Sequence, residues 1–164
     1  MSYLVAPGEG EAILMGGLGV VHKLSGRETG GSFSVVEHPI ASGVLAAPPH
    51  THEREDEFSL VLEGEIGVQI GDEEFTAGPG AYVLKPRGVS HTFWNPGPGA
   101  ARLMEIISTA GFERYFGEIA EVIAAASGGP PDFERISEIA GDYDLTFHMD
   151  QMPALMERHG VELR

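Results

Sequence analysis

Residues 48–57 read Pro-Pro-His-Thr-His-Glu-Arg-Glu-Asp-Glu, and the mostly apolar stretch 58–62 follows them. His50 and His52 are separated by a single residue. Side chains at positions i and i+2 of an extended strand point to the same side, so the two imidazoles can share one target. Neutral imidazole is the commonest protein ligand for a metal ion. The stretch therefore predicts half of a metal-binding site on a β-strand.

A third histidine, His91, follows the turn-forming sequence Pro86-Arg87-Gly88 and opens a predicted strand over 91–94. A lone histidine in such a place is more often a core or surface residue than a ligand. Its combination with His50 and His52 favours a ligand. The remaining histidines have no comparable neighbours, and we expect them to be structural or exposed: His22, His38, His148 and His159.

The same stretch offers four acidic candidates for a further ligand: Glu53, Glu55, Asp56 and Glu57. Strand alternation alone does not choose among them. If residues 53–56 form the turn between two adjacent strands, Glu57 opens the second strand on the interior side, together with Ser59 and Val61. For three of the four acidic residues we expect a solvated turn.

Short strands separated by turns make up the first two thirds of the chain. The 23 glycines and 11 prolines are spread along the sequence and punctuate it. Turn signals every eight to twelve residues or so are typical of a β-sandwich or barrel. We expect a flexible loop at 25–31, a short strand near 42–45, and further strands at 20–24, 32–38, 57–62, 66–70, 74–76, 81–85, 90–94 and 101–108.

After Ser108 the apolar residues recur at helical spacing. One apolar stripe runs from Phe112 to Ile123, and Asp132 is expected to cap a second helix that ends near Ala140. Residues 145–148 fit either class of structure, and 152–159 predict a last short helix. This tail is too small for a core of its own. We therefore expect one domain, with a β-barrel over 1–110 and a helical extension over 111–164 that packs on it.

The charge and composition exclude several classes of protein. A formal net charge of −15 argues against nucleic acid or an anionic membrane as the main partner. The sequence contains no cysteine, so disulfides and thiolate metal sites are ruled out. Neither a signal peptide nor a membrane span is visible, and we expect a cytoplasmic protein.

The stretch from Gly43 to Asn95 resembles the two sequence motifs of the cupin superfamily, a group of small double-stranded β-helix barrels of the jelly-roll type. The first motif corresponds to residues 43–64 and the second to residues 80–95. Six residues separate Gly43 from His50 where five are usual, and a short segment of 15 residues, 65–79, joins the motifs. The matching positions are Gly43, His50, His52, Glu57 and Gly64, then Gly80, Pro86, Gly88, His91 and Asn95.

This resemblance implies that His50, His52, Glu57 and His91 are the ligands of one divalent transition metal, and it chooses Glu57 over its acidic neighbours. Imidazole and carboxylate together suit Fe, Mn, Ni, Cu or Zn. A metal that prefers five or six ligands keeps open positions when the protein supplies four.

The tail begins Gly111-Phe112-Glu113, which is similar to cupins of the quercetin 2,3-dioxygenase type. The resemblance implies a dioxygenase or related oxidoreductase that acts on a small aromatic or enolisable substrate with dioxygen. Glu57 would then be both ligand and catalytic base. We expect an apolar pocket walled by aromatic and sulfur-containing residues, with core packing as the alternative for each: Phe93, Trp94, Met104, Phe112, Tyr115 and Phe116.

Two other functions remain open on the same scaffold. One is an isomerase, epimerase or lyase that uses the metal as a Lewis acid, and the other is a non-catalytic module that binds a small ligand. The resemblance also implies a homodimer formed through edge strands, with 20–24 and 33–36 as candidate edges.

Overall fold

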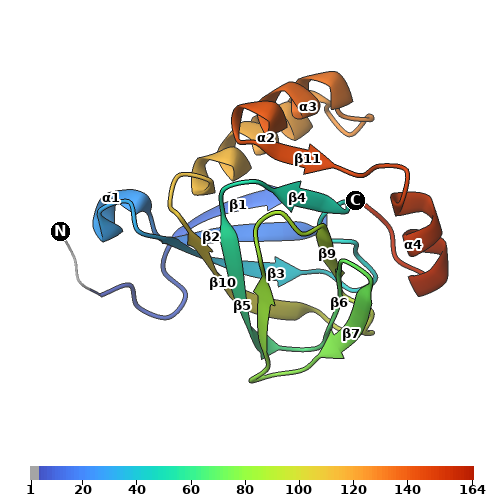
Figure 1. Cartoon of the computed structure of the whole chain (residues 1–164), viewed down its shortest axis with the longest axis horizontal. Coiled ribbons are helices and arrows are strands. Elements are labelled where there is room, and N and C mark those ends of the chain that lie inside the picture. The colour runs from blue at the N-terminus through green and yellow to red at the C-terminus, as the bar shows by residue number, and fades with distance from the viewer. Residues whose placement is uncertain (1–3) are drawn as a thin grey trace.

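The computed structural model describes residues 4–164 and contains two antiparallel β-sheets that face each other (Figure 1). The six-stranded sheet has the order β1 (Glu11–Met15), β2 (Leu18–Leu24), β3 (Ser34–Ile40), β10 (Ala101–Ser108), β5 (Asp56–Glu63), β8 (Tyr82–Lys85). The five-stranded sheet has the order β11 (Leu145–Phe147), β4 (His50–His52), β9 (His91–Trp94), β6 (Ile66–Ile70), β7 (Glu73–Ala77). The predicted all-β, jelly-roll barrel is confirmed.

Period-two alternation builds the barrel, because successive side chains of a strand point to opposite faces of its sheet. In β10, Leu103 and Ile107 are fully buried, whereas Met104 and Ile106 are only half-buried. The buried residues of both sheets meet in one apolar cluster that includes Val61 and Leu103 from the larger sheet and Val68 from the smaller one. The core therefore lies between the sheets, as it does in other sandwiches.

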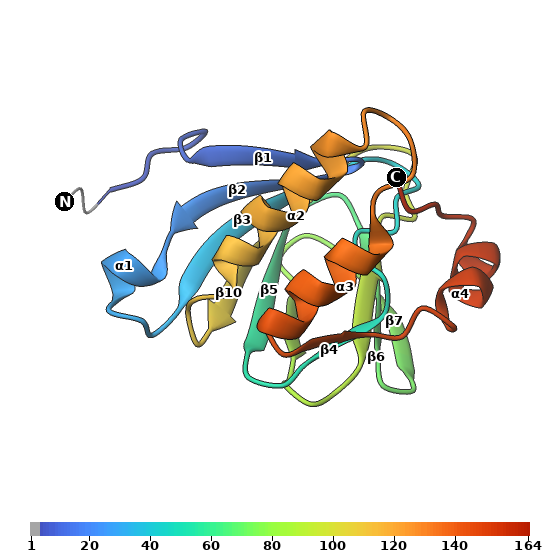
Figure 2. The same cartoon turned by 90° about the horizontal axis from the view of Figure 1, so that it is seen from above.

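The helical tail packs on the barrel through two further apolar clusters. Helix α2 (Glu113–Ala125) and helix α3 (Phe133–Asp142) lie together over the strands, as Figure 2 shows. Phe116 and Ile119 of α2 share a second apolar cluster with Val20, Val36 and Ile107, which lie on strands of the six-stranded sheet. Helix α4 (Met152–His159) contributes Leu155 to a third apolar cluster, which also contains Leu45, Trp94 and Val161. The tail thus packs on the barrel as predicted, and the boundary between 110 and 111 stays a prediction.

Several local predictions are confirmed and others are wrong. Asp132 caps α3, since its side chain accepts a hydrogen bond from the Arg135 backbone N–H, and the ambiguous residues near 145 form β11. The loop expected at 25–31 contains a short helix, α1 (Gly26–Thr29), which a Ser25–Glu28 capping box begins. The strand expected near 42–45 is reduced to two isolated bridges, because this stretch only touches strand β9 and the chain end.

The expected dimer edges are also wrong. Strand β2 pairs with β1 and β3, and β3 pairs with β2 and β10, so both lie inside the six-stranded sheet. Strand β1 covers the edge of β2, and the sequence at 11–15 predicts a strand less clearly than the sequence at 20–24 does. The open edges of this sheet, within residues 4–164, belong to β1 and β8.

Candidate metal centre

Four side chains from three strands converge in the barrel interior. His50 and His52 lie on β4, His91 opens the neighbouring strand β9 directly opposite His50, and Glu57 lies on β5. All four side chains are buried, and one potential ligand atom from each lies within 4.8 Å of the others. The structure therefore brings together the four residues that the sequence selects, and their arrangement could hold a metal ion.

Glu57 reaches the histidines by a different route from the one expected. Strand β4 belongs to the five-stranded sheet and β5 to the six-stranded sheet, so residues 53–55 cross from one sheet to the other. They do not join two neighbouring strands. Glu57, Ser59 and Val61 are all buried on the interior side of β5, as predicted. Glu57 thus faces His52 and His91 across the barrel, with carboxylate oxygens 3.3 Å and 3.2 Å from their Nε2 atoms.

Hydrogen bonds to the backbone fix the orientation of two of the imidazoles. Nδ1 of His50 lies 2.7 Å from the Pro48 carbonyl oxygen, and Nδ1 of His91 lies 3.1 Å from the Val89 carbonyl oxygen. A carbonyl oxygen only accepts, so each Nδ1 carries the hydrogen and donates it. In the neutral ring the lone pair is then on Nε2, the atom left for the centre of the cluster. Metal-binding histidines use the same arrangement.

The donor set fits a transition metal. Nε2 of His52 and Nε2 of His91 are buried and have no hydrogen-bond partner in the described part of the chain. The nearby Glu57 oxygens are close to them, but not in hydrogen-bonding geometry. A buried nitrogen without a partner is costly, and a cation between these atoms would remove that cost. Imidazole nitrogen with carboxylate oxygen is a donor set that Fe, Mn, Ni, Cu and Zn accept.

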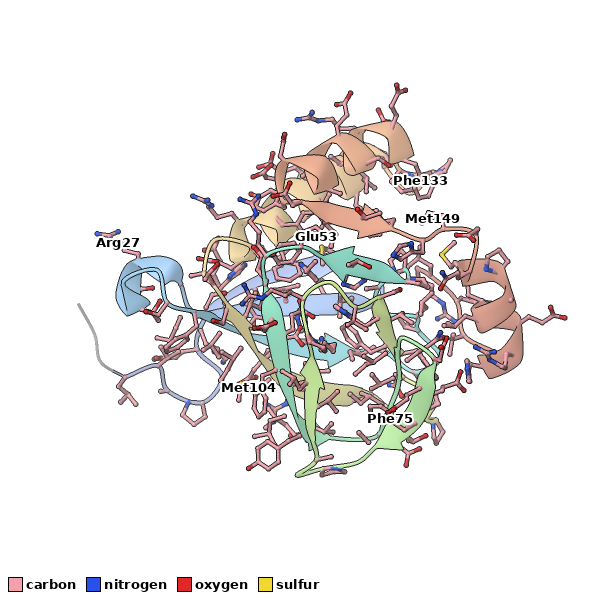
Figure 3. All side chains as sticks on the ribbon, in the orientation of Figure 1. Arg27, Glu53, Phe75, Met104, Phe133 and Met149 are labelled. Carbon is pink, nitrogen blue, oxygen red and sulfur yellow. The ribbon has the colours of Figure 1, made fainter. Side chains whose placement is uncertain are left out.

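The acidic turn differs from the expectation at one residue. Glu53 is exposed (Figure 3), and Asp56 forms a half-exposed ion pair with Arg87 at 2.8 Å. Glu55, however, is buried, and its Oε2 lies 3.6 Å from Nδ1 of His52. The solvated reading of Glu55 is therefore wrong. This carboxylate is a charged neighbour of His52 beyond hydrogen-bond distance, whereas the backbone carbonyls hydrogen-bond the other two histidines.

The charges around the centre shift the pKa values of its members in opposite directions. Burial alone would lower the pKa of His52, but the carboxylates of Glu57 and Glu55 outweigh it and raise the pKa to about 9. Burial and the neighbouring imidazoles of His91 and His52 hold the pKa of His50 well below its usual value. Burial would raise the pKa of Glu57, but the charges of Lys85 and His52 dominate and hold it well below its usual range.

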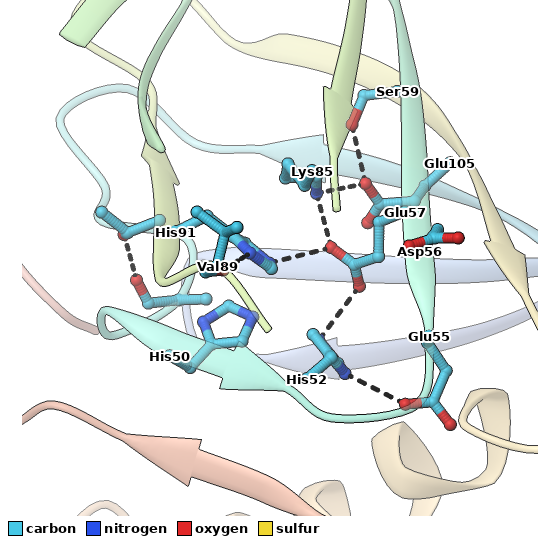
Figure 4. A network of polar contacts seen from close by, with 12 residues as sticks. His50, His52, Glu55, Asp56, Glu57, Ser59, Lys85, Val89, His91 and Glu105 are labelled. Carbon is cyan, nitrogen blue, oxygen red and sulfur yellow. Dashed lines mark hydrogen bonds and ion pairs between the residues drawn. The ribbon is translucent and has the colours of Figure 1, made fainter. Parts of the chain in front are cut away.

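The structure adds a set of buried polar residues that the sequence reading missed. Lys85 pairs with Glu57 at 2.7 Å and also with Glu105, which in turn accepts a hydrogen bond from Ser59 (Figure 4). Glu105 also lies 3.3 Å from Nε2 of His38. One signal was present: Glu105 alternates with Leu103 and Ile107 and so occupies an inward position of its strand. His38 is structural and buried, as expected.

The other histidines lie outside the cluster. His148 contacts Thr51 through its Nε2 at 2.8 Å, and His159 stacks on Trp94 and pairs with Glu74. His22 is half-buried against Phe116. None of them reaches the centre, in agreement with the prediction.

A cavity of about 510 Å³ adjoins the cluster. His50, His52 and Glu57 border it on the barrel side, and the helical tail supplies an opposite, apolar side. Of the expected pocket residues, four line this cavity: Phe93, Phe112, Tyr115 and Phe116. Two do not, because Trp94 packs with α4 in the third apolar cluster and the side chain of Met104 points to the outer face of its sheet. Phe133 and Met149 also border the cavity, on the side of the molecule that carries the helices (Figure 3).

The motif glycines have a backbone role in this arrangement. Gly64 and Gly88 have φ values of 70° and 74°, in the left-handed region where a side chain is disfavoured. A Cβ atom on Gly64 would also lie 2.8 Å from the Ala100 carbonyl oxygen. The glycines at these positions thus form the turns that end β5 and precede β9.

Comparisons with known proteins agree with this fold. Residues 38–107 match the family model described as a cupin domain. Quercetin 2,3-dioxygenase of Bacillus subtilis (strain 168) is 33% identical over 93 residues, which are 57% of this chain and 27% of that protein. The chain therefore spans only about a quarter of the length of that relative. Within residues 4–164, no helix is long and apolar enough to cross a membrane.

Solved structures of low sequence identity share the barrel. KdgF from Halomonas sp. superposes with a TM-score of 0.60 at 16% identity, covering 70% of this chain and 99% of that one. The polyketide cyclase RemF from Streptomyces resistomycificus superposes with a TM-score of 0.57 at 23% identity, covering 66% of this chain and 80% of that one. An RmlC-like cupin from Shewanella frigidimarina superposes with a TM-score of 0.58 at 19% identity, covering 70% of this chain and 96% of that one. The two-sheet barrel and the paired histidine motifs agree with the match to a cupin domain over residues 38–107, and the chain has the cupin fold.

Proposed function

We propose that this chain is a metal-dependent enzyme, a dioxygenase or related oxidoreductase of the quercetin 2,3-dioxygenase type. The observation that carries the proposal is the convergence of three buried imidazoles and one carboxylate at the edge of an apolar cavity. Such a cavity, with a few polar groups at one side, is the usual form of a small-molecule site.

In this proposal His50, His52, Glu57 and His91 hold one divalent transition metal: Fe, Mn, Ni, Cu or Zn. The metal would supply Lewis-acid and dioxygen chemistry, as open positions on such ions do. The backbone carbonyls behind His50 and His91 keep Nε2 directed to the centre. The Glu55 carboxylate lies 3.6 Å from Nδ1 of His52 and is a charged neighbour of that ring.

The cavity walls support a small, flat and mostly uncharged substrate. Phe112, Phe116 and Phe147 border the cavity with their rings. Aromatic faces pack well against other ring systems. Within residues 4–164, the arginine that borders the cavity, Arg164, is paired with Glu162, and Arg54 and Arg87 pair on the surface. Among the described residues, the cavity lining thus offers a sugar phosphate no arginine or lysine without an acidic partner, which favours the oxidoreductase over an isomerase.

Glu57 has a second proposed role as the base that accepts the substrate's proton. The ion pair with Lys85 keeps this carboxylate ionised and able to accept a proton. The same ion pair makes it a weak base, so it suits only an acidic donor. An enolic or phenolic hydroxyl would become such a donor if it were bound to the metal, because a metal ion lowers the pKa of a hydroxyl that it binds.

Oxygen consumption tests the proposal. Protein purified without an affinity tag and reconstituted in turn with each of the five metals would be given quercetin, and separately the same flavone without its 3-hydroxyl group. We expect oxygen uptake with at least one metal and only with quercetin. Bound metal without oxygen uptake from either compound would contradict the dioxygenase and would favour a Lewis-acid isomerase or lyase, or a ligand-binding module.

We also propose a homodimer. The part of the outer face of the six-stranded sheet that β5 and β8 form exposes large apolar side chains. Tyr82 and Leu84 on β8 are 70% and 59% exposed, and they lie in register with Leu60 and Phe58 on β5. This face and the open edge of β8 are the surfaces that support the proposal. Light scattering coupled to gel filtration should give twice the chain mass, and a monomer at micromolar concentration would remove the dimer.

A further inference from the structure

A lysine is fully buried beside the metal centre. Lys85 is 1% exposed, and its Nζ lies between Oε2 of Glu57, at 2.7 Å, and Oε1 of Glu105. Moving an ammonium and two carboxylates out of water costs several kcal/mol for each charge, so a buried cluster of charges is seldom kept for stability alone. Its position next to a ligand carboxylate points to a role at that ligand.

The lysine is held from several sides. Glu105 is itself fixed by Ser59, whose Oγ donates a hydrogen bond to it at 2.7 Å, and by His38 at 3.3 Å. The ring of Phe93 lies on another side, with its centroid 4.7 Å from Nζ. Figure 4 shows the resulting chain of contacts from Glu105 through Lys85 to Glu57. These contacts hold the ammonium group in one position, where it contacts a single oxygen of Glu57.

This contact makes the two oxygens of Glu57 unequal. Oε2 is bound by the ammonium and also lies 3.2 Å from Nε2 of His91, while Oε1, which the ammonium does not contact, lies 3.3 Å from Nε2 of His52. A carboxylate can bind a metal through one oxygen or through both. An oxygen that already accepts a strong charge-assisted hydrogen bond has less electron density to give to a metal.

We propose that Lys85 is a positioning residue that restricts Glu57 to one coordinating oxygen. The inference rests on the proposed metal site. Three imidazole nitrogens and one carboxylate oxygen leave two of six positions open, whereas a second carboxylate oxygen would close one of them. Lys85 and its anchor Glu105 would thus keep room at the metal for two exogenous donor atoms, such as a chelating substrate or a substrate together with dioxygen.

Cobalt is the probe for this inference, because the visible spectrum of Co²⁺ changes each time an added ligand such as azide replaces water at the metal, so the positions open to added ligands can be counted. The variants are Lys85→Met, which removes the ammonium and keeps much of the side-chain volume, and the double variant Lys85→Met with Glu105→Gln. The double variant removes one charge of each sign, so it leaves no unpaired Glu105 if the single variant does not fold. Arg102→Met is the matched control, since Arg102 also forms two ion pairs with glutamates, but on the outer side of the same sheet.

We expect the wild type and Arg102→Met to bind one Co²⁺ per chain with the same spectrum. Both Lys85 variants should still bind one Co²⁺, but each should take up one azide where the wild type takes up two. An unchanged azide stoichiometry in the folded double variant would overturn the inference, and so would a complete loss of Co²⁺ binding. If the wild type binds no Co²⁺ at all, the metal site itself fails, which is a different result from an unchanged variant.

Discussion

The two sides of the cavity are built from different kinds of residue. The barrel side carries ionisable side chains with polar or charged neighbours: His50 donates to a backbone carbonyl, Glu57 pairs with Lys85, and His52 has the Glu55 carboxylate 3.6 Å away. The helical side, from α2, α3 and β11, is almost entirely apolar, with Phe116 and Phe147 as examples. The difference indicates a division of labour in which the barrel provides the chemistry and the tail provides the fit to substrate.

Removing a ligand should have the largest effect, and only on the barrel side. His91→Ala should weaken metal binding by roughly 100- to 1,000-fold, if one of four ligands carries about a quarter of a typical total of 10–16 kcal/mol. Metal affinity by competition with a chelator measures this. His148→Ala is the control, because that histidine also contacts β4 but lies outside the cluster. Loss of the far-UV β signal in His91→Ala would show instead that the metal holds the barrel together.

Truncating the helical side should cost stability and leave the metal in place. Phe116 is buried in the cluster that joins α2 to the barrel, so Phe116→Ala should lower the free energy of unfolding by about 3 kcal/mol. Chemical denaturation of the metal-free protein measures the loss. Phe133→Ala, at a half-exposed cavity residue, should cost far less. A drop in metal stoichiometry in the folded Phe116→Ala protein would break the proposed division of labour.

The pH dependence of metal binding sharpens the account of the barrel side. In the metal-free protein the pKa of His52 is raised to about 9, so its proton stabilises the fold fully below about pH 6.5, and that stabilisation is lost as the pH rises through 9. A metal must displace this proton. Affinity should therefore rise about tenfold for each pH unit between 6.5 and 9. Titrations at three pH values measure it, and Glu55→Gln should flatten the slope by removing a carboxylate that holds the proton. An affinity that does not change with pH would contradict the assignment.

A substitution at the surface, away from both sides of the cavity, should have the smallest effect on stability and metal binding. Arg87 forms its ion pair with Asp56 at the surface, where solvent and salt screen the attraction. Arg87→Ala should leave the thermal midpoint and the metal affinity close to those of the wild type. A large fall in metal affinity would mean that the turn before β9 places His91 through this pair.

The sequence predicts the metal side well because its information is local. His50 and His52 point to the same side because they are two positions apart on one strand, and His91 follows a turn that the sequence Pro86-Arg87-Gly88 predicts. Glu57 could not be chosen by spacing, since its partners lie on the opposite sheet, and only the resemblance to cupins selected it. The capping box of α1 was present as Ser25 and Glu28 and could have been read.

The missing part of the site depends on contacts between distant segments. Lys85, Glu105 and His38 meet because three strands of the larger sheet are packed in a particular order, which no local pattern encodes. The role of Glu55 depends on the path of the chain between the sheets. In the same way, the helical periodicity of the tail predicts α2 but not which face of the barrel it covers.

The most direct test of the central claim is anomalous X-ray diffraction from crystals of the metal-loaded protein, recorded at the absorption edge of the bound metal. The account predicts one strong peak per chain at about 2.0–2.2 Å from Nε2 of His50, His52 and His91 and from an oxygen of Glu57. A peak elsewhere, or none after soaking with each candidate metal, would contradict it.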